Sequence, residues 1–157
     1  MRCCKQASFM LYYTQSTAPI KNCRHKAYAF LAAPTEGMFH MEDCIFCKIA
    51  AGEIPATKVY EDEAVLAFRD LDPQAPTHVL IIPKQHIASA AEITPENSGV
   101  VAHTFEVAAQ LAQELGLEKG FRIVNNCGED GMQSVQHLHF HLLGGKQMGW
   151  PPFPPQP

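Results

Sequence analysis

The sequence predicts one α+β domain, an antiparallel five-stranded sheet with two helices, preceded by a tail. Three observations support this prediction: two stretches have helical signals, five short stretches have strand character, and tight turns separate neighbouring strands. With 157 residues, of which 46% are hydrophobic, the chain is long enough to bury one core and short for two.

The two helices are predicted from their end signals and their apolar spacing. The first covers residues 44–51, with Asp43 as its cap. The second has Thr94 as its N-cap, Pro95 at its first position and Gly116 just beyond its end. Apolar residues recur at steps of three and four along the second helix, so one of its faces should pack on a sheet.

The strands are predicted from short apolar stretches bounded by acidic or proline-containing turns. The first two should form a hairpin. The predicted ranges are 58–61, 64–69, 78–82, 121–126 and 137–143. The PPFPPQP tail after Trp150 can enter neither a helix nor a sheet and is expected to run extended.

Residues 1–40 differ in composition from the rest of the chain. They contain five Lys and Arg residues, one acidic residue and no sustained apolar period. Such a segment cannot bury enough surface to fold alone, so we expect a disordered extension before a domain at 41–157. It is alternatively a transit segment, or an upstream artefact if Met41 is the true start. We expect a cytoplasmic protein, or a mitochondrial or plastid one if this segment is a transit peptide.

Charge and cysteine usage exclude several classes of protein. The net charge of -4 and the absence of a long Lys/Arg run argue against a nucleic-acid partner. No apolar run approaches the roughly 20 residues that span a bilayer, so no membrane partner is expected. The six cysteines are scattered, which does not resemble a secreted disulfide framework.

Three histidines at positions 137, 139 and 141 alternate with Leu138 and Phe140. The period of two in a strand sends the two sets to opposite faces, so one face carries three imidazoles. Imidazoles are awkward to bury and repel one another when charged. A functional site is therefore the better interpretation of this row.

Such a row is typical either of a metal cluster or of nucleophilic and general-acid chemistry. A polar turn with Asn126, Gly128, Gly131 and Ser134 lies directly upstream. Its backbone N–H groups and its hydroxyl are suited to holding an anion. This turn favours phosphate chemistry over a bare metal centre.

The run HLHFHLL at residues 137–143 resembles the signature of the histidine-triad (HIT) superfamily. The segments CIFCKIAAGEIPA, VYEDEAVLAFRDLDPQAPTHVLIIPKQHI, MQSV and GGKQMGWPP are similar to its HINT branch, the histidine triad nucleotide-binding proteins. The resemblance covers residues 43 to about 152. It implies a HIT-like fold and a two-fold homodimer in which two sheets join into one.

The resemblance implies hydrolysis of the P–N bond of purine nucleoside 5'-phosphoramidates, giving a nucleoside monophosphate and an amine through a nucleotidyl-histidine. His139 matches the nucleophile, and a neutral imidazole can attack phosphorus without further activation. His141 matches the group that contacts phosphate and helps the amine to leave, while Ser134 would hold phosphate oxygens. His78 matches a fourth histidine, with a relay role or a structural role equally open. His137 completes the triad.

The resemblance also implies a set of nucleotide-binding residues. Asp70 matches the acid that binds the ribose hydroxyls. The other matches are three side chains around the purine (Ile45, Phe46, Leu71), the phosphate-site residues Asn126 and Gln133 beside Ser134, and Trp150, which would reach toward the partner's site or only pack the interface. Met132 departs from the family pattern, because many members have glycine there.

Cys44 and Cys47 form a C-x-x-C pair whose spacing lets two thiolates reach one tetrahedral ion. The other ligands in similar zinc proteins match His86 and His137. The sequence thus predicts a structural zinc ion that the chemistry does not require, and it makes His137 structural if zinc binds. The alternative is that the two cysteines are small buried residues.

Two other functions stay open at this point. One is hydrolysis of dinucleoside polyphosphates, as in another branch of the superfamily, although the GGKQM and WPP segments argue against it. The other is a nucleotide-binding interaction protein without catalytic activity. The intact triad and Ser134 favour an enzyme acting on a purine nucleotide.

Overall fold

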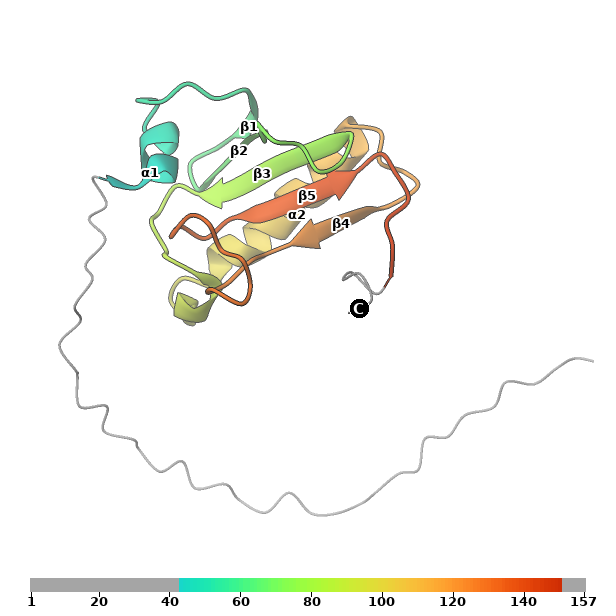
Figure 1. Cartoon of the computed structure of the whole chain (residues 1–157). Coiled ribbons are helices and arrows are strands. Elements are labelled where there is room, and N and C mark those ends of the chain that lie inside the picture. The colour runs from blue at the N-terminus through green and yellow to red at the C-terminus, as the bar shows by residue number, and fades with distance from the viewer. Residues whose placement is uncertain (1–42, 151–157) are drawn as a thin grey trace, which may run out of the picture. The chain divides into compact units, whose positions relative to one another are not determined.

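The computed structural model describes residues 43–150. The predictions for residues 1–40 and for the tail after Trp150 lie outside the described residues. The described part has a five-stranded antiparallel sheet and two α-helices, which confirms the predicted fold class (Figure 1). None of the helices in this part is long and apolar enough to cross a bilayer.

The sheet has the strand order β1-β2-β3-β5-β4, and every neighbouring pair is antiparallel. Because β5 lies between β3 and β4, the histidine run is placed beside β3. Register pairs His78 with Leu143 and Leu80 with His141, so His78 and His141 are diagonal neighbours on one face. The strands are β1 (Lys58–Glu61), β2 (Val65–Arg69), β3 (Thr77–Pro83), β4 (Phe121–Val124) and β5 (Phe140–Gly144).

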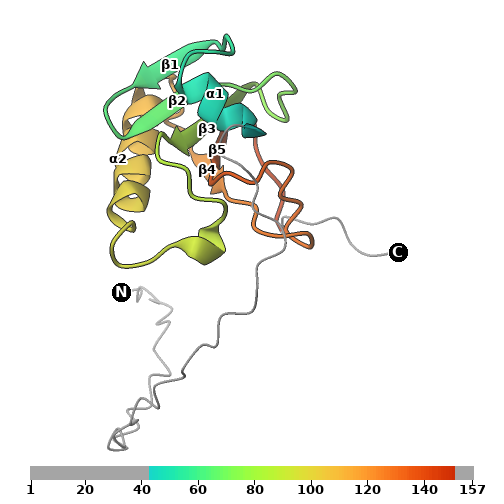
Figure 2. The same cartoon turned by 90° about the vertical axis from the view of Figure 1, so that its left-hand side faces the viewer.

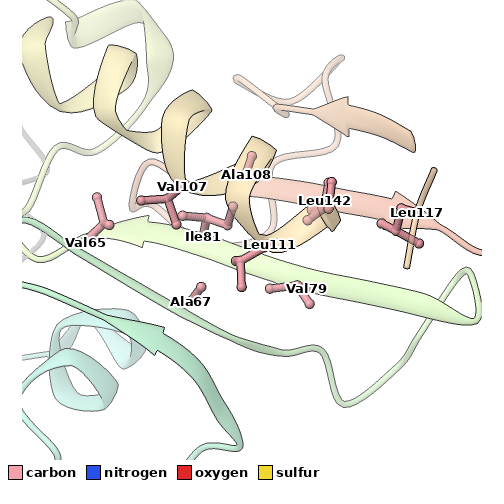
Figure 3. Close-up of a cluster of buried hydrophobic side chains, with 10 residues drawn as sticks. Val65, Ala67, Val79, Ile81, Val107, Ala108, Leu111, Leu117 and Leu142 are labelled. Atoms are coloured by element: carbon pink, nitrogen blue, oxygen red, sulfur yellow. The ribbon is translucent and has the colours of Figure 1, made fainter. Parts of the chain in front are cut away.

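Alternate residues of the strands build two apolar layers, one on each face of the sheet. Helix α2 (Gly99–Glu114) covers one face, and its buried side chains meet those of β2, β3 and β5 (Figure 3). The short helix α1 (Ile45–Ala50) covers the other face, where Phe46 and Ile49 pack on Leu66, Phe68, Leu80 and Ile82. Figure 2 gives a turned view of the two helices and the sheet. The histidine face is the one that α1 covers.

The starts of both helices differ from the prediction. Cys44, not Asp43, takes the N-cap position of α1 and makes no side-chain cap bond. Helix α2 begins at Gly99 after Ser98, not at Pro95. Asn97 explains the later start, because its Oδ1 accepts the Thr94 N–H at 2.7 Å and closes a separate turn. The predicted end of α2 is correct, since Gly116 follows it with a φ of 69°.

The last two strands are shorter than predicted: β4 ends at Val124 and β5 begins only at Phe140. Hydrogen bonds outside the ladder hold the preceding residues. The Leu138 N–H donates to the Ile87 carbonyl at 2.6 Å, and the Asn125 side chain donates to the His139 carbonyl at 2.8 Å. His137 and His139 therefore lie before the strand, and the prediction of three imidazoles on one strand was wrong.

The alternation of faces nevertheless continues through this irregular segment. Leu138 and Phe140 are buried in a cluster with Ile87 and residues of α2. His137 and His139 lie on the opposite side, where both rings meet Phe46 of α1 edge-on at centroid distances of 5.9 and 5.2 Å.

An ion pair joins α2 to the β1–β2 hairpin and is expected to make stability depend on pH. His103 Nε2 lies 2.6 Å from Asp62 Oδ2, and hydrogen bonds to Asp62 and then Glu106 raise the pKa of His103 above its usual 6.5. A raised folded-state pKa stabilises the fold fully below the unfolded pKa, and this stabilisation is lost as pH rises through the folded pKa. The pair is partly exposed, so we expect at most about 1 kcal/mol.

Urea unfolding of wild type and His103→Gln at pH 5.5 and pH 9 measures this effect. We expect the wild type to lose more stability than the variant between the two pH values. An identical loss in both proteins would contradict the assignment to His103.

Candidate active site and metal centre

His139 is held in one tautomer with a free nitrogen lone pair. Its Nδ1 lies 2.7 Å from the carbonyl oxygen of His137, which can only accept a hydrogen bond. The proton is therefore on Nδ1, and Nε2 carries the lone pair. The carbonyl of His139 itself accepts from Asn125 Nδ2 at 2.8 Å, which fixes the backbone on both sides of the ring. The arrangement leaves the Nε2 lone pair available as a nucleophile.

A chain of hydrogen bonds sets the tautomer of His141. The Gln74 N–H donates to His78 Nδ1 at 3.2 Å, so His78 carries its proton on Nε2. That proton points to His141 Nδ1 at 2.8 Å, and the His141 proton is therefore on Nε2. Asp70 Oδ2 also lies 3.4 Å from His78 Nε2.

The Nε2–H of His141 is a buried donor with no partner among the described residues. Burial first, and then the charges of His139 and His78, lower the pKa of His141 to about 4. The ring is therefore neutral at pH 7 and presents one N–H. Buried donors in proteins are nearly always paired, so a substrate oxygen or nitrogen is the natural partner for this one.

His139 and His141 line one cavity of about 270 Å³ together with Ser134. We call it the histidine cavity. Its walls include Ile45 and Phe46 of α1, Asp70 and Leu71 after β2, and residues 54–57 before β1. The volume is close to the lower end of small-molecule sites, about 300 Å³. A larger hollow of about 820 Å³ between residues 116–120 and 145–147 contains no histidine or cysteine.

The structure brings some of the sequence-predicted site residues into the histidine cavity and leaves others outside. Leu71 lines the cavity but is fully exposed, and Trp150 is 84% exposed. Gln133 braces a loop, because its Nε2 donates to the carbonyls of Ala88 and Val135. Asn126 Nδ2 donates to the Met132 carbonyl at 3.3 Å, away from the cavity lining.

Sequence reasoning missed Asn125 and Gln74: Asn125 holds the backbone carbonyl of His139, and Gln74 donates to His78, which in turn donates to His141. Asn125 had a weak signal, since an amide side chain at the end of a strand often replaces a backbone partner. Gln74 acts through its backbone, so its residue type carries no signal.

The turn at residues 127–134, upstream of the triad, contains a strained residue. Met132 has a φ of 57°, the left-handed region that costs a side-chain-bearing residue about 1–2 kcal/mol. Its side chain is 79% exposed, so it contributes little packing. Glycine adopts this conformation without the strain that a Cβ causes.

Met132→Gly is therefore expected to raise the free energy of unfolding by about 0.5–1 kcal/mol, because relief of the strain exceeds the added chain entropy. Urea unfolding measures the change. Met132→Ala is the matched control and should show no gain, since alanine keeps the Cβ that causes the strain. A gain as large in alanine as in glycine would assign the effect to the removed side chain.

A second cluster lies beside the histidine cavity and consists of Cys44, Cys47, His86 and His137, the four residues predicted as zinc ligands. We call it the Cys2His2 cluster. Their ligand atoms all lie within 4.8 Å of one another. His137 Nδ1 is 3.3 Å from Cys44 Sγ, 3.5 Å from Cys47 Sγ and 3.3 Å from His86 Nδ1. A tetrahedral zinc ion with ordinary bond lengths separates its ligand atoms by about 3.3–3.8 Å.

The protonation of His137 also suits a metal ligand. Its Nε2–H donates to the Pro83 carbonyl at 2.9 Å, which leaves Nδ1 unprotonated and facing the thiols. Burial is the main cause that lowers the pKa of His137 to about 4, so the ring is neutral. The four residues thus fit a structural zinc ion. A closed set of four protein ligands leaves no open position for catalysis.

Comparisons with known proteins agree with this geometry. The family model described as HIT domain matches residues 51–148. The 14 kDa zinc-binding protein of Zea mays is 53% identical over 110 residues, covering 69% of this chain and 86% of the maize protein. An uncharacterized HIT-like protein of Synechococcus elongatus is 51% identical over 111 residues, covering 71% of this chain and 97% of that protein.

The solved structures agree as well. A HIT family hydrolase from Legionella pneumophila superposes with a TM-score of 0.69 at 55% identity, covering 71% of this chain and all of that chain. The range matched by the family model, residues 51–148, includes the histidine run and all five strands. The chain therefore belongs to the HIT domain family.

Proposed function

We propose that this protein hydrolyses purine nucleoside 5'-phosphoramidates through a nucleotidyl-histidine on His139. The main observation behind the proposal is that a nitrogen lone pair and a hydrogen-bond donor belong to two histidines that line the same cavity. His139 Nε2 is available to attack phosphorus. The Nε2–H of His141, which has no partner within residues 43–150, lies on the neighbouring ring, with centroids 5.1 Å apart.

The reaction follows from these two nitrogens. A bond forms between His139 Nε2 and phosphorus, and the P–N bond of the substrate breaks as its nitrogen takes a proton from a solvent water. The neutral ring of His141 keeps its proton, and its Nε2–H donates a hydrogen bond to the departing nitrogen. Water then attacks phosphorus, the proton that it loses neutralises the hydroxide left by the first step, and neutral His139 is released with the nucleoside monophosphate.

The remaining lining residues support a nucleoside as the bound group. Asp70 Oδ1 accepts the Asp72 N–H at 2.8 Å, and Oδ2 lies 3.4 Å from His78 Nε2. A carboxylate has about four acceptor sites, so sites remain for sugar hydroxyls. Ile45 and Phe46 provide an apolar wall for a base. Ser134 lies with His139 and His141 at the phosphate end, where its hydroxyl can hold a non-bridging oxygen.

We also propose that the Cys2His2 cluster holds zinc. The donor distances and the tautomer of His137 support it, and the maize relative is named as a zinc-binding protein. Zinc would there be a structural ion that ties Cys44 and Cys47 of the α1 segment to the loop that carries His86.

We further propose a two-fold homodimer that pairs the β4 edges of two chains. β4 is an edge strand of the sheet, and an unpaired edge is a template for another strand. Phe121 on β4 is 43% exposed and Phe105 on α2 is 49% exposed, which leaves apolar surface on that side. We expect light scattering to give twice the chain mass. A monomer mass at micromolar concentration would contradict the dimer.

Turnover of adenosine 5'-monophosphoramidate beside a diadenosine polyphosphate tests the proposed substrate class. We expect the phosphoramidate to have the higher kcat/KM. Preference for the polyphosphate would move the assignment to the other hydrolase class. Binding of AMP with neither substrate cleaved would support a nucleotide-binding protein without catalytic activity.

A further inference from the structure

We infer that the Cys2His2 cluster positions the nucleophile and the base-facing wall of the histidine cavity, so that metal binding and nucleotide binding strengthen each other. The inference rests on the proposed function for the choice of nucleotide as ligand. Its decisive measurements are binding constants and a tautomer, neither of which requires turnover. His137 and α1 are the two connections between the sites.

The first connection is His137, whose ring and backbone serve different sites. The ring faces both thiols and His86 through Nδ1, and its Nε2–H is bonded to the Pro83 carbonyl. The backbone carbonyl of the same residue accepts the Nδ1–H of His139 at 2.7 Å. His137 is fully buried. Because ring and carbonyl belong to one residue, a shift of the His137 backbone that follows loss of a ligand also moves the carbonyl that sets the His139 tautomer.

The second connection is α1, which carries ligands and cavity wall in one turn. Cys44 and Cys47 belong to the Cys2His2 cluster, while Ile45 and Phe46 between them line the histidine cavity. The helix has six residues and no side-chain N-cap bond. A helix this short is not stable without tertiary contacts. The position of the wall therefore depends on the packing of Phe46 and Ile49 against the sheet and on the two thiols that bracket Ile45 and Phe46.

Phe46 adds a direct contact between the two connections. Its ring packs edge-on against His137 at 5.9 Å and against His139 at 5.2 Å, measured between centroids. A shift of α1 away from His137 therefore also removes a packing partner of His139. The two connections have the same effect. When the four ligands bind one ion, both hold His139 and the wall of Ile45 and Phe46 in place at the histidine cavity.

The experiment measures AMP affinity by calorimetry for the zinc-loaded full chain, the chelated chain and His86→Asn. His86 is the informative ligand to change, because it lies neither on α1 nor in the lining of the histidine cavity. We expect the Kd for AMP to rise at least about fivefold on chelation and in His86→Asn. His103→Gln is the matched control on α2, and its Kd should stay at the wild-type value.

Reciprocity gives a second measurement on the intact wild type. Saturating AMP should raise zinc affinity by the same factor by which zinc raises AMP affinity. This direction keeps the inference testable if the chelated chain unfolds. Equal zinc affinity with and without AMP would overturn it.

Nitrogen NMR of His139 distinguishes a loss of positioning of its ring from a general loss of stability of the domain. In the zinc-loaded chain we expect the single Nδ1–H tautomer, and in folded His86→Asn a mixture of tautomers with a kcat lowered about 10-fold or more. An unchanged tautomer together with an unchanged Kd would overturn the inference. Zinc–AMP coupling without phosphoramidate cleavage would instead reject the proposed function and leave the coupling established.

Discussion

His139→Ala is expected to lower kcat for adenosine 5'-monophosphoramidate by about 10⁴-fold or more, because removal of a nucleophile abolishes the covalent path. AMP binding should survive. The groups expected to hold the nucleotide, Asp70, Ser134 and the Nε2–H of His141, remain in the histidine cavity. We therefore expect the free energy of AMP binding to change by less than about 1 kcal/mol, or about fivefold in Kd.

Rapid quench with radiolabelled substrate and calorimetry with AMP measure the two effects. The wild type should accumulate an acid-labile adenylyl-protein that His139→Ala lacks. His139→Gln controls for the cavity left by alanine, since it keeps much of the volume without a ring nitrogen. Turnover at the wild-type rate in either variant would remove His139 as the nucleophile.

The sheet was predictable from sequence because its signals are local. Apolar residues are continuous along β2 and β3, because successive side chains face opposite sides of a sheet whose two faces are both covered. These continuous apolar runs lie between clear turns. All five strands appear. The start of β5 was not predictable, because it depends on a carbonyl of Ile87 and an amide of Asn125 that only the folded chain brings to residues 138 and 139.

The candidate site, like the sheet, was predictable only in part from the sequence. The spacing of the histidines indicated a functional site, and the alternation of faces correctly separated them from Leu138 and Phe140. The tautomers of His139 and His141 depend on the His137 carbonyl and the Gln74 N–H. Backbone groups are the same in every residue, so no residue type predicts which of them will lie beside a ring.

Removal of zinc is expected to destabilise the domain strongly. A ligand that binds only the folded chain adds about 4 kcal/mol at a free concentration a thousandfold above its Kd. Each kcal/mol corresponds to roughly 4 °C in Tm for a domain of this size. Chelation of the wild type, or Cys44→Ser, should therefore lower Tm by about 15 °C.

The two perturbations should not add, and this distinguishes a zinc ligand from a buried thiol. If Cys44 acts through the metal, a chelator lowers Tm of the wild type and leaves Cys44→Ser nearly unchanged. Cys127→Ser is the control, because Cys127 is a free, exposed cysteine outside the Cys2His2 cluster; it should keep the wild-type Tm and its response to chelator. A wild type that contains no metal by elemental analysis and melts independently of chelator would leave packing as the only role of the cysteines.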